Sequence, residues 1–310
     1  MRSRPPDRDV TDPDAPLAAA REGPARLLAA LPSDPDARSD RLRAVRDRAQ
    51  TDPASVADAL PGLAALFDDE ADTVRLLTAK TFLAVAEADP GSVPTDPLRG
   101  ALDDEFYYVR ARAAQALGRV ARATGEADPA LVARLLNGLS LEREESRERY
   151  AGALADVALG APDALRTVSA DLADSLDDEG VRVRYHLATA LAALAVAHPG
   201  RVEAVADRLR VRLDDEDPHV AGRAAEALGY GGVDCDPPVW SGDATEDARA
   251  FATARVAFAR DPAPATRERL VADLRAEHDS VAEGVGVPDE PDGPPGLPPG
   301  LGPDGPGGPF

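Results

Sequence analysis

The stretch Ser175–Ala195, SLDDEGVRVRYHLATALAALA, holds three consecutive carboxylates and then, after a short gap, a Val-Arg pair. Two aspartates and a glutamate side by side could form a metal site or an acid–base pair, or they could be purely structural. Similar strings begin at Phe67 (FDDE), Leu102 (LDDE) and Leu213 (LDDE), with a degenerate copy at Leu139 (LSLE). A catalytic cluster is needed once, whereas this one recurs with nearly every unit, so we interpret the carboxylates as structural.

The copies repeat with a nearly constant period. Aligned on one position, called here the reference column, they give spacings of 35, 37, 37 and 37 residues. The reference column consists of Val74, Val109, Ser146, Val183 and Val220. A near-constant period in this range is typical of a solenoid, in which each unit is one supersecondary element stacked on its neighbours. The repeat therefore predicts an all-α solenoid, a right-handed superhelix of about five helix pairs.

Each unit is predicted to contain two helices. The second begins at the carboxylates and carries small or apolar residues at offsets 0, +4, +5, +8 and +11 from the reference column, which is one face of an amphipathic helix. Several second helices end near Asp-Pro or His-Pro, where proline stops one helix and can begin the next. The first helices are expected at Ala54–Leu66, Ala130–Leu139, Ala164–Leu176 and Arg201–Leu213, with a short one in Gly91–Ala101.

An arginine follows the second Asp of three copies by six residues, and this order of Asp, Val-Arg, Ala and Leu resembles the HEAT-repeat family over roughly residues 52–232. The resemblance implies a ladder of Asp and Arg that ties neighbouring units together. Its residues here are Asp69, Arg75, Asp104, Arg110, Arg147, Asp178, Arg184 and Asp215. Leu141 replaces the Asp and Ala221 replaces the Arg, so those two junctions are expected to be less firmly tied. The carboxylates are also placed to accept hydrogen bonds from N–H groups at the start of the second helix.

The composition is strongly acidic, with 56 Asp and Glu against 35 Lys and Arg and a net charge of −21. Lys80 is the only lysine, Asn137 is the only asparagine, and isoleucine is absent. A GC-rich genome explains this, and the composition also resembles that of proteins from salt-loving archaea. A negative field disfavours nonspecific binding to nucleic acid or anionic lipid. Because Cys235 is alone and no signal peptide or membrane span is recognisable, we expect a soluble cytoplasmic protein.

The two flanks differ from the repeat. Residues 1–33 are expected to be partly disordered, although Pro16–Leu31 has a helical pattern, and residues 34–51 to form a capping helix. Residues 233–285 are expected to form a helical cap, with helices at Ala244–Arg260 and Ala265–Glu283 and with Trp240 packed beneath the preceding turn. Terminal units of this kind protect the open ends of solenoids. Residues 286–310, rich in Pro and Gly, are expected to be disordered.

No pattern typical of catalysis is recognisable. The sequence has no glycine-rich phosphate loop, no cysteine pair, no His-Glu-x-x-His and no Gly-x-Ser-x-Gly. Two enzyme groups with HEAT-like units are the alternatives: deoxyhypusine hydroxylases, which bind a di-iron centre through repeated His-Glu pairs, and phycobilin lyases. No His-Glu pair occurs here and nothing marks a bilin pocket. Glu277-His278 is explained by a solvated helix face. We predict no enzyme activity, no cofactor and no metal.

The remaining candidate site is a surface. In HEAT-type solenoids the second helices line the concave side, and we call the residues three positions after the reference column the +3 column. It is expected to be exposed and consists of Leu77, Arg112, Arg149, His186 and Arg223. Two interpretations stay open: arginines that pair with nearby Glu on a solvated face, or a basic stripe that receives an acidic peptide, protein face or phosphate chain.

Aromatic residues gather at one turn of the second copy. Phe106, Tyr107 and Tyr108 stand together in a chain with few aromatics, and exposed aromatics beside arginine are typical of protein contacts. Together with the +3 column they predict a noncatalytic scaffold that binds a protein partner on its concave face. Binding to nucleic acid through the arginines is disfavoured by the net charge.

Overall fold

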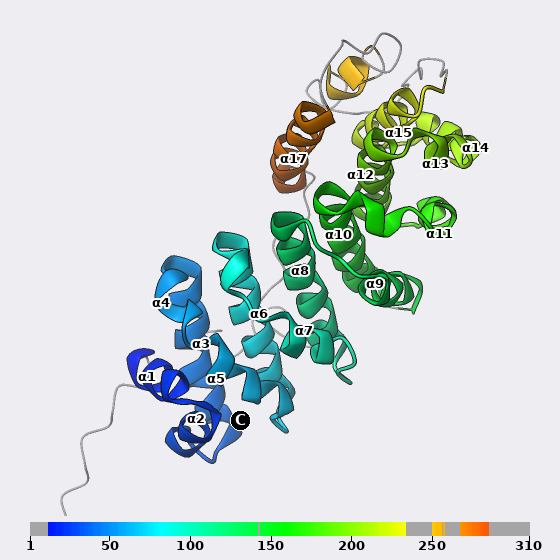
Figure 1. Cartoon of the computed structure of the whole chain (residues 1–310). Helices are drawn as coiled ribbons and strands as arrows, with labels where there is room; N and C mark the ends of the chain where they lie inside the picture. Colours follow the sequence, from blue (N-terminus) through cyan, green and yellow to red (C-terminus); the bar gives the residue numbers. More distant parts are fainter. Residues whose placement is uncertain (1–11, 142, 234–249, 256, 258–266, 285–310) are drawn as a thin grey trace, which may run out of the picture.

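The computed structural model describes residues 12–141, 143–233, 250–255, 257 and 267–284. These residues are helical with connecting turns, and no strand occurs among them. The helices stack side by side into an arc, which confirms the predicted all-α solenoid (Figure 1). No helix in the described ranges is long and apolar enough to cross a membrane.

The second helices of the repeat line the inner side of the arc (Figure 1). They are α6 (Asp72–Ala88), α8 (Tyr107–Thr124), α10 (Glu144–Gly160), α12 (Val181–Ala197) and α15 (Pro218–Tyr230). All five residues of the reference column are fully buried. The apolar face predicted from the offsets therefore forms the core between units, where burial of apolar surface stabilises the stack.

The first helices are shorter and more broken than expected. Only α9 (Pro129–Leu141) is a single long helix, and the predicted short element at 91–101 is η2 (Pro90–Ser92) followed by α7 (Thr95–Ala101). The other three units use α4 (Ala54–Ala57), α5 (Leu60–Leu63) and η1 (Ala64–Asp68); η3 (Pro162–Leu165), α11 (Ser169–Asp174) and η4 (Ser175–Asp177); and α13 (Pro199–Glu203), α14 (Ala206–Val211) and η5 (Arg212–Asp214).

The breaks have local causes. Pro61 lacks an N–H and cannot continue the helix from α4. In the two later units the break falls at the equivalent residues Val168 and Val205, whose φ values are −115° and −118°. Both are β-branched, and such side chains favour a helix less than straight ones do. The expectation of single continuous first helices was wrong for these three units.

The N-terminal flank contains α1 (Asp14–Glu22), α2 (Pro24–Ala30) and α3 (Pro35–Thr51). The expected capping helix packs against α6 as a further second helix. Arg38 stands 37 residues before Arg75 and pairs with Asp69 at 3.0 Å. Ser39 shares a hydrogen bond of 2.9 Å with Thr73. The ladder thus begins one unit earlier than the repeat pattern in the sequence predicts.

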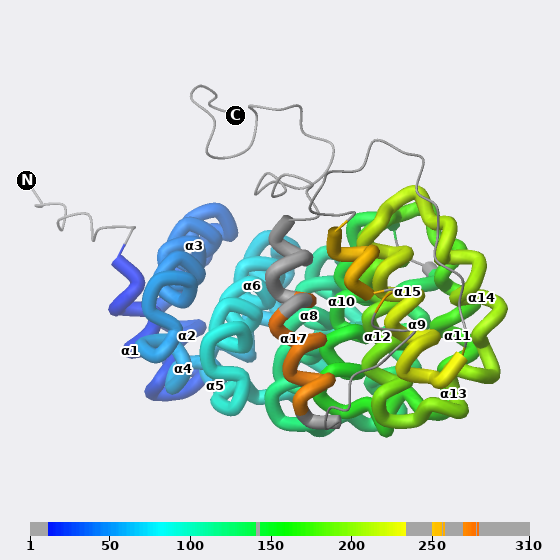
Figure 2. Tube along the Cα trace, turned by 90° about the horizontal axis from the view of Figure 1, so that it is seen from above, coloured from blue at the N-terminus to red at the C-terminus, as the bar shows by residue number. Residues whose placement is uncertain are grey.

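The C-terminal flank returns to the inner side of the arc. Helix α17 (Arg267–Gly284) lies over the face formed by α8, α10 and α12 (Figure 2). Residues 250–255 are helical, within the helix expected at 244–260. Trp240 and residues 286–310 lie outside the described residues.

Arginine–aspartate pairs join successive units near the start of each second helix. Each arginine contacts the aspartate of the following unit. The pairs and their N–O distances are Arg75–Asp104 (2.8 Å), Arg147–Asp178 (2.7 Å) and Arg184–Asp215 (2.9 Å). One guanidinium and one carboxylate therefore bridge two units, in addition to the apolar packing between them.

The links of Arg75 and Arg184 also fix the turns on both of their sides. The Arg184 guanidinium donates to both carboxylate oxygens of Asp215 and to the backbone carbonyls of Asp178 and Glu179, at 2.9 and 3.0 Å in each case. Asp215 in turn accepts a 3.1 Å bond from the N–H of Asp217, which precedes α15. As expected, these carboxylates accept hydrogen bonds from backbone N–H groups that have no partner within the helix. The donor is the N–H of the residue just before the helix.

The junction at Leu141 is closely packed, and the expectation that it is less firmly tied than the others stays a prediction. Arg110 donates to the backbone carbonyls of Asp104 and Glu105. Helices α8 and α10 meet through glycine: a Cβ at Gly118 would lie 2.8 Å from the Ala153 Cα. Ala221 is the other position where the sequence departs from the repeat. There α15 packs against the helix at 250–255, because a Cβ at the adjacent Gly222 would meet Phe251 and Ala252.

Candidate binding pocket on the inner face

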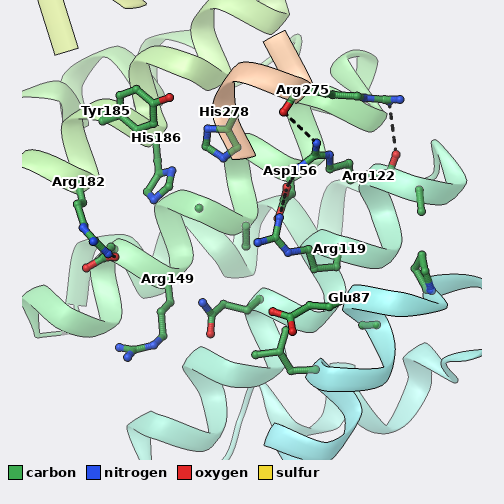
Figure 3. A pocket seen from close by; sticks show the side chains of 18 residues that line it. Glu87, Arg119, Arg122, Arg149, Asp156, Arg182, Tyr185, His186, Arg275 and His278 are labelled. Carbon is green, nitrogen blue, oxygen red and sulfur yellow. Dashed lines mark hydrogen bonds and ion pairs between the residues drawn. The ribbon is translucent and has the colours of Figure 1, made fainter. Parts of the chain in front are cut away.

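A pocket of about 810 Å³ opens on the inner face of the arc. Its walls come from the C-terminal halves of α6 and α8, the middle of α10, the start of α12, and α17 (Figure 3). Pockets of this size are typical of sites for small molecules or for a few side chains of a partner. Four repeat units and the C-terminal flank contribute to it together.

Arginine outnumbers carboxylate in this pocket. Five guanidinium groups line it, against three carboxylates. The arginines are Arg119, Arg122, Arg149, Arg182 and Arg275, and the carboxylates are Glu87, Glu148 and Asp156. The local excess is positive although the whole chain carries −21. Such a reversal of sign in a concave site attracts negative groups, because the low-dielectric walls focus the field.

Several of these charges hold one another in place. The buried carboxylate of Asp156 accepts from Arg119 at 3.1 Å and from Arg122 at 3.3 Å. Across the opening, Arg182 pairs with Glu148 at 2.7 Å. One carboxylate shared by two guanidinium groups leaves a net positive charge, and the pairing orients both arginines without neutralising them.

Two histidines complete the pocket. The rings of His186, on α12, and His278, on α17, lie with centroids 5.1 Å apart, and His278 stacks on Tyr185 at 5.7 Å (Figure 3). The Nδ1 atom of each histidine is buried and has no hydrogen-bond partner among the described residues. Burial and the nearby Arg182 lower the pKa of His186 to about 3. Burial and the neighbouring His186 hold the pKa of His278 well below its usual range.

Helix α17 is attached to the pocket by a few specific contacts. Leu274 is fully buried, and the Arg275 guanidinium donates to the carbonyl of Leu159 in the last turn of α10, with an Nε–O distance of 3.0 Å. Arg122 donates back to the carbonyl of Arg275 at 3.3 Å. A guanidinium is favourable beside the carbonyl end of a helix, because that end carries partial negative charge. His278 was expected on a solvated face and is instead 3% exposed.

The +3 column divides into pocket residues and core residues. Arg149 and His186 line the pocket, and Arg112 is half-buried on α8, where it donates to Gln115 at 3.0 Å. The expectation of exposure was wrong for Leu77 and Arg223, which are buried. The column is therefore not one continuous open stripe.

Arg223 belongs to a buried network instead. Its side chain is 0% exposed and donates to Glu226 at 2.6 Å and to the Tyr185 hydroxyl at 3.3 Å. The guanidinium also lies 5.2 Å from the centroid of the Phe251 ring. A strong charge can be buried here because a carboxylate and two aromatic faces surround it. A Glu at this position would face Glu226, so Arg223 is unsuitable for testing surface binding.

The aromatic cluster lies away from the pocket. Tyr108 is buried, whereas Phe106 and Tyr107 are half-buried, and Arg143 lies 5.3 Å from the centroid of the Tyr107 ring. The cluster stands at the start of α8, twelve residues before Arg119, which is about 18 Å along a helix. The expectation of exposed aromatics is wrong for Tyr108, and the structure does not bring the cluster together with the arginines that line the pocket.

Sequence reasoning missed most of the pocket residues. Arg119 and Asp156 share one column, ten residues after the reference column, and this alternation of charge was a signal that could have found them. Arg275 and His278 had no such signal, because they lie outside the repeats. No group of three or more His, Cys, Asp or Glu in the described parts of the chain is arranged to hold a metal ion.

No protein-family model matches the chain. No curated protein matches it either. Solved structures with a similar fold include a designed armadillo repeat protein, with a TM-score of 0.54 and 18% identity over 64% of this chain and 95% of that one. An engineered protein has a TM-score of 0.58 and 21% identity over 64% and 92% of the two chains.

A third similar structure is a designed armadillo repeat protein in complex with the peptide (KR)4, with a TM-score of 0.56 and 18% identity over 70% of this chain and 99% of that one. At these identities the likeness concerns the fold alone. It places the chain among armadillo-like helical-repeat solenoids.

Proposed function

We propose that this chain is a noncatalytic scaffold of the HEAT type, which binds an acidic segment of a protein partner on its inner face. The observation that carries the proposal is the excess of arginine over carboxylate in the 810 Å³ pocket of a chain with net charge −21. The net negative charge repels an acidic segment from the molecule as a whole, whereas the pocket arginines attract it. Charge of this kind provides specificity and a fast association rate.

The similar designed protein in complex with (KR)4 supports the general mode, in which a helical-repeat solenoid binds a peptide. The lining of the present pocket carries charge of the sign that repels such a basic peptide. We therefore infer a partner segment rich in Asp and Glu. The proposal includes no chemical step, because guanidinium groups and neutral imidazoles supply charge and hydrogen bonds to a ligand. The acidic composition further favours the cytoplasm of a salt-loving organism as the setting.

The test is binding of a fluorescent oligoglutamate peptide, followed by anisotropy, with oligoglutamine as the uncharged control peptide. Arg149→Gln should weaken oligoglutamate binding about tenfold, the loss expected when one charge-assisted hydrogen bond is removed. Arg149 lines the pocket, and its guanidinium donates to the carbonyl of Glu145 in its own helix, so the substitution should leave the fold intact.

Arg210→Gln is the matched control variant, because it removes the same charge from α14, on the outer side of the arc. It should bind like the parent. Equal affinity for oligoglutamate and oligoglutamine, or equal losses in the two variants, would show that the pocket arginines do not select an acidic segment.

A further inference from the structure

Arg119 lines the pocket from a fixed position on α8. Its guanidinium donates to the Asp156 carboxylate at 3.1 Å, and the side chain of Asp156, on α10, is only 5% exposed. The Arg119 side chain is itself 36% exposed and borders the opening (Figure 3). A guanidinium has five N–H donors, and Asp156 is the one hydrogen-bond partner of Arg119 among the described residues. Donors of Arg119 therefore remain for a ligand.

Two further arginines border the same opening from the next two units. Arg149 extends from α10 and Arg182 from α12 (Figure 3). Arg182 pairs with Glu148 at 2.7 Å, and the Arg149 guanidinium donates to the carbonyl of Glu145. With Arg119, three successive second helices thus each supply one guanidinium group that is oriented by a contact within the protein.

The pocket carries two more positive than negative charges. Five guanidinium groups stand against three carboxylates, and both histidine rings are neutral at pH 7 because burial lowers their pKa. A single carboxylate of a ligand neutralises one of these charges. A phosphate monoester carries about −1.5 to −2 at pH 7, so it matches the charge of the pocket with one group.

We propose that the acidic segment bound in this pocket carries a phosphate on one of its side chains, and that Arg119, Arg149 and Arg182 bind this phosphate. The inference rests on the proposed function, since the phosphorylated side chain belongs to that segment. The planar fork of a guanidinium matches the oxygens of a phosphate, and three acceptor oxygens can take bonds from more than one arginine.

The dimensions and charges around the site favour a short segment with one phosphate. The pocket of about 810 Å³ holds more than a phosphate and accommodates neighbouring side chains of the same segment. Glu87 provides a carboxylate on the α6 wall, and the whole chain carries −21. Both disfavour a long run of phosphates, such as the backbone of a nucleic acid.

The test compares two fluorescent peptides by anisotropy with the full chain. One is Glu-Glu-phosphoserine-Glu-Glu, and the other is hexaglutamate, which has the same formal charge when the phosphate is fully ionised. The phosphopeptide should bind about tenfold more tightly, the gain expected from one additional charge-assisted hydrogen bond. Equal charge on the two peptides separates recognition of the phosphate from attraction by the field of the pocket.

Arg119→Lys keeps the positive charge and removes the fork. It should abolish most of the preference for the phosphopeptide, because an ammonium group binds phosphate as a point charge. Arg210→Lys makes the same change on α14, on the outer side of the arc, where Arg210 pairs with the exposed Asp207. This control variant should keep the full preference.

Each remaining outcome overturns a defined part of the inference. If hexaglutamate binds the parent as tightly as the phosphopeptide does, the phosphate site is overturned and the proposed function stands. If inorganic phosphate competes as well as the phosphopeptide at equal concentration, the site is one for free phosphate, and the phosphorylated segment is overturned. Equal preference in Arg119→Lys and Arg210→Lys would remove Arg119 from the site. If neither acidic peptide binds the parent better than oligoglutamine, both proposals fall together.

Discussion

At the scale of single residues, the ladder arginines do more than pair with carboxylates. Arg184 contacts the following unit through Asp215 and its own turn through two carbonyls, and its side chain is 6% exposed. Burial lowers the pKa of the Arg184 guanidinium, but the bonds to Asp215 outweigh this, so the net shift is upward. The charge is retained inside the protein because its partner is also inside.

Arg184→Ala should therefore destabilise the protein by roughly 1.5–3 kcal/mol, the cost of losing hydrogen bonds to a charged group, because the buried Asp215 carboxylate would keep only its longer 3.3 Å pair with Arg212. Urea unfolding followed by circular dichroism measures the loss, and hydrogen exchange should locate it in α12 and α15. Arg208→Ala is the control. Its pairs with Asp174 and Asp177 are exposed, so the change should stay within about 1 kcal/mol. Equal losses would show that the ladder adds nothing beyond a surface ion pair.

At the scale of helices, small residues determine how closely neighbouring units approach. Helix α8 meets α10 where Gly118 faces Ala153, and Gly160 meets the carbonyl of Ala121 from the other side. The junction that lacks the ladder aspartate, at Leu141, is thus held by close backbone packing. Short-range dispersion acts over many atoms there, and Asp156 on α10 also pairs with Arg119 and Arg122 on α8.

Gly118→Ala should lower the stability by about 1–3 kcal/mol, because the new Cβ would lie 2.8 Å from the Ala153 Cα and the helices would have to separate. Gly100→Ala makes the same chemical change in α7 with nothing within 4 Å. It should be neutral or stabilising by about 0.5–1 kcal/mol, because alanine favours a helix. Thermal unfolding of both variants measures the difference, and similar behaviour of the two would contradict close packing at this junction.

Docking of α17 should also depend on pH. The pKa of His278 in the folded protein lies well below its unfolded value near 6.5, so the unfolded chain binds the proton first. The contribution of the neutral ring to stability is fully present above about pH 6.5 and is lost as the pH falls below that value.

His278→Phe cannot take up this proton. Between about pH 7 and pH 4.5 the parent should lose up to about 2.7 kcal/mol more stability than the variant, a limit set by the two pH units between 6.5 and 4.5 at about 1.36 kcal/mol each. Calorimetry at the two pH values measures both proteins. Other groups that titrate in this range, including His186, are common to parent and variant. Parallel losses would mean that His278 is protonated equally in the folded and unfolded chains.

At the scale of the whole molecule, the net charge and the pocket respond to salt in opposite ways. A net charge of −21 repels itself most strongly in the compact state. Salt reduces the Debye length from about 10 Å at 0.1 M to about 3 Å at 1 M, so the self-repulsion is screened. The same screening weakens the attraction between pocket arginines and an acidic ligand.

We therefore expect the melting temperature of the parent to rise between about 0.1 M and 1 M NaCl while its affinity for oligoglutamate falls. Thermal unfolding and anisotropy on the same samples measure both. Sucrose, which carries no charge, serves as the control additive and should leave the affinity unchanged. A melting temperature that does not respond to salt would show that self-repulsion does not limit the stability of this fold.

The solenoid could be predicted from the amino-acid sequence alone, because the apolar packing face repeats with the period of the units. A side chain on that face contacts the equivalent side chain of the next unit, so one period of about 37 residues defines both the helix and its neighbour. The reference column is buried in all five copies for this reason. The first helices were predicted less accurately. Their apolar pattern predicts continuous helices, but Pro61 and the valines Val168 and Val205 interrupt them.

Which charged residues form the pocket could not be predicted from the repeat, because it depends on contacts between distant parts of the chain. Arg223 and Arg149 occupy the same column, yet one is enclosed by Tyr185 and Phe251 while the other lines the opening. Helix α17 adds His278 from outside the repeat, at a place that no periodicity indicates. Burial of a charge depends on what the rest of the chain places over it, and that information is long-range, whereas a repeat is read from neighbours alone.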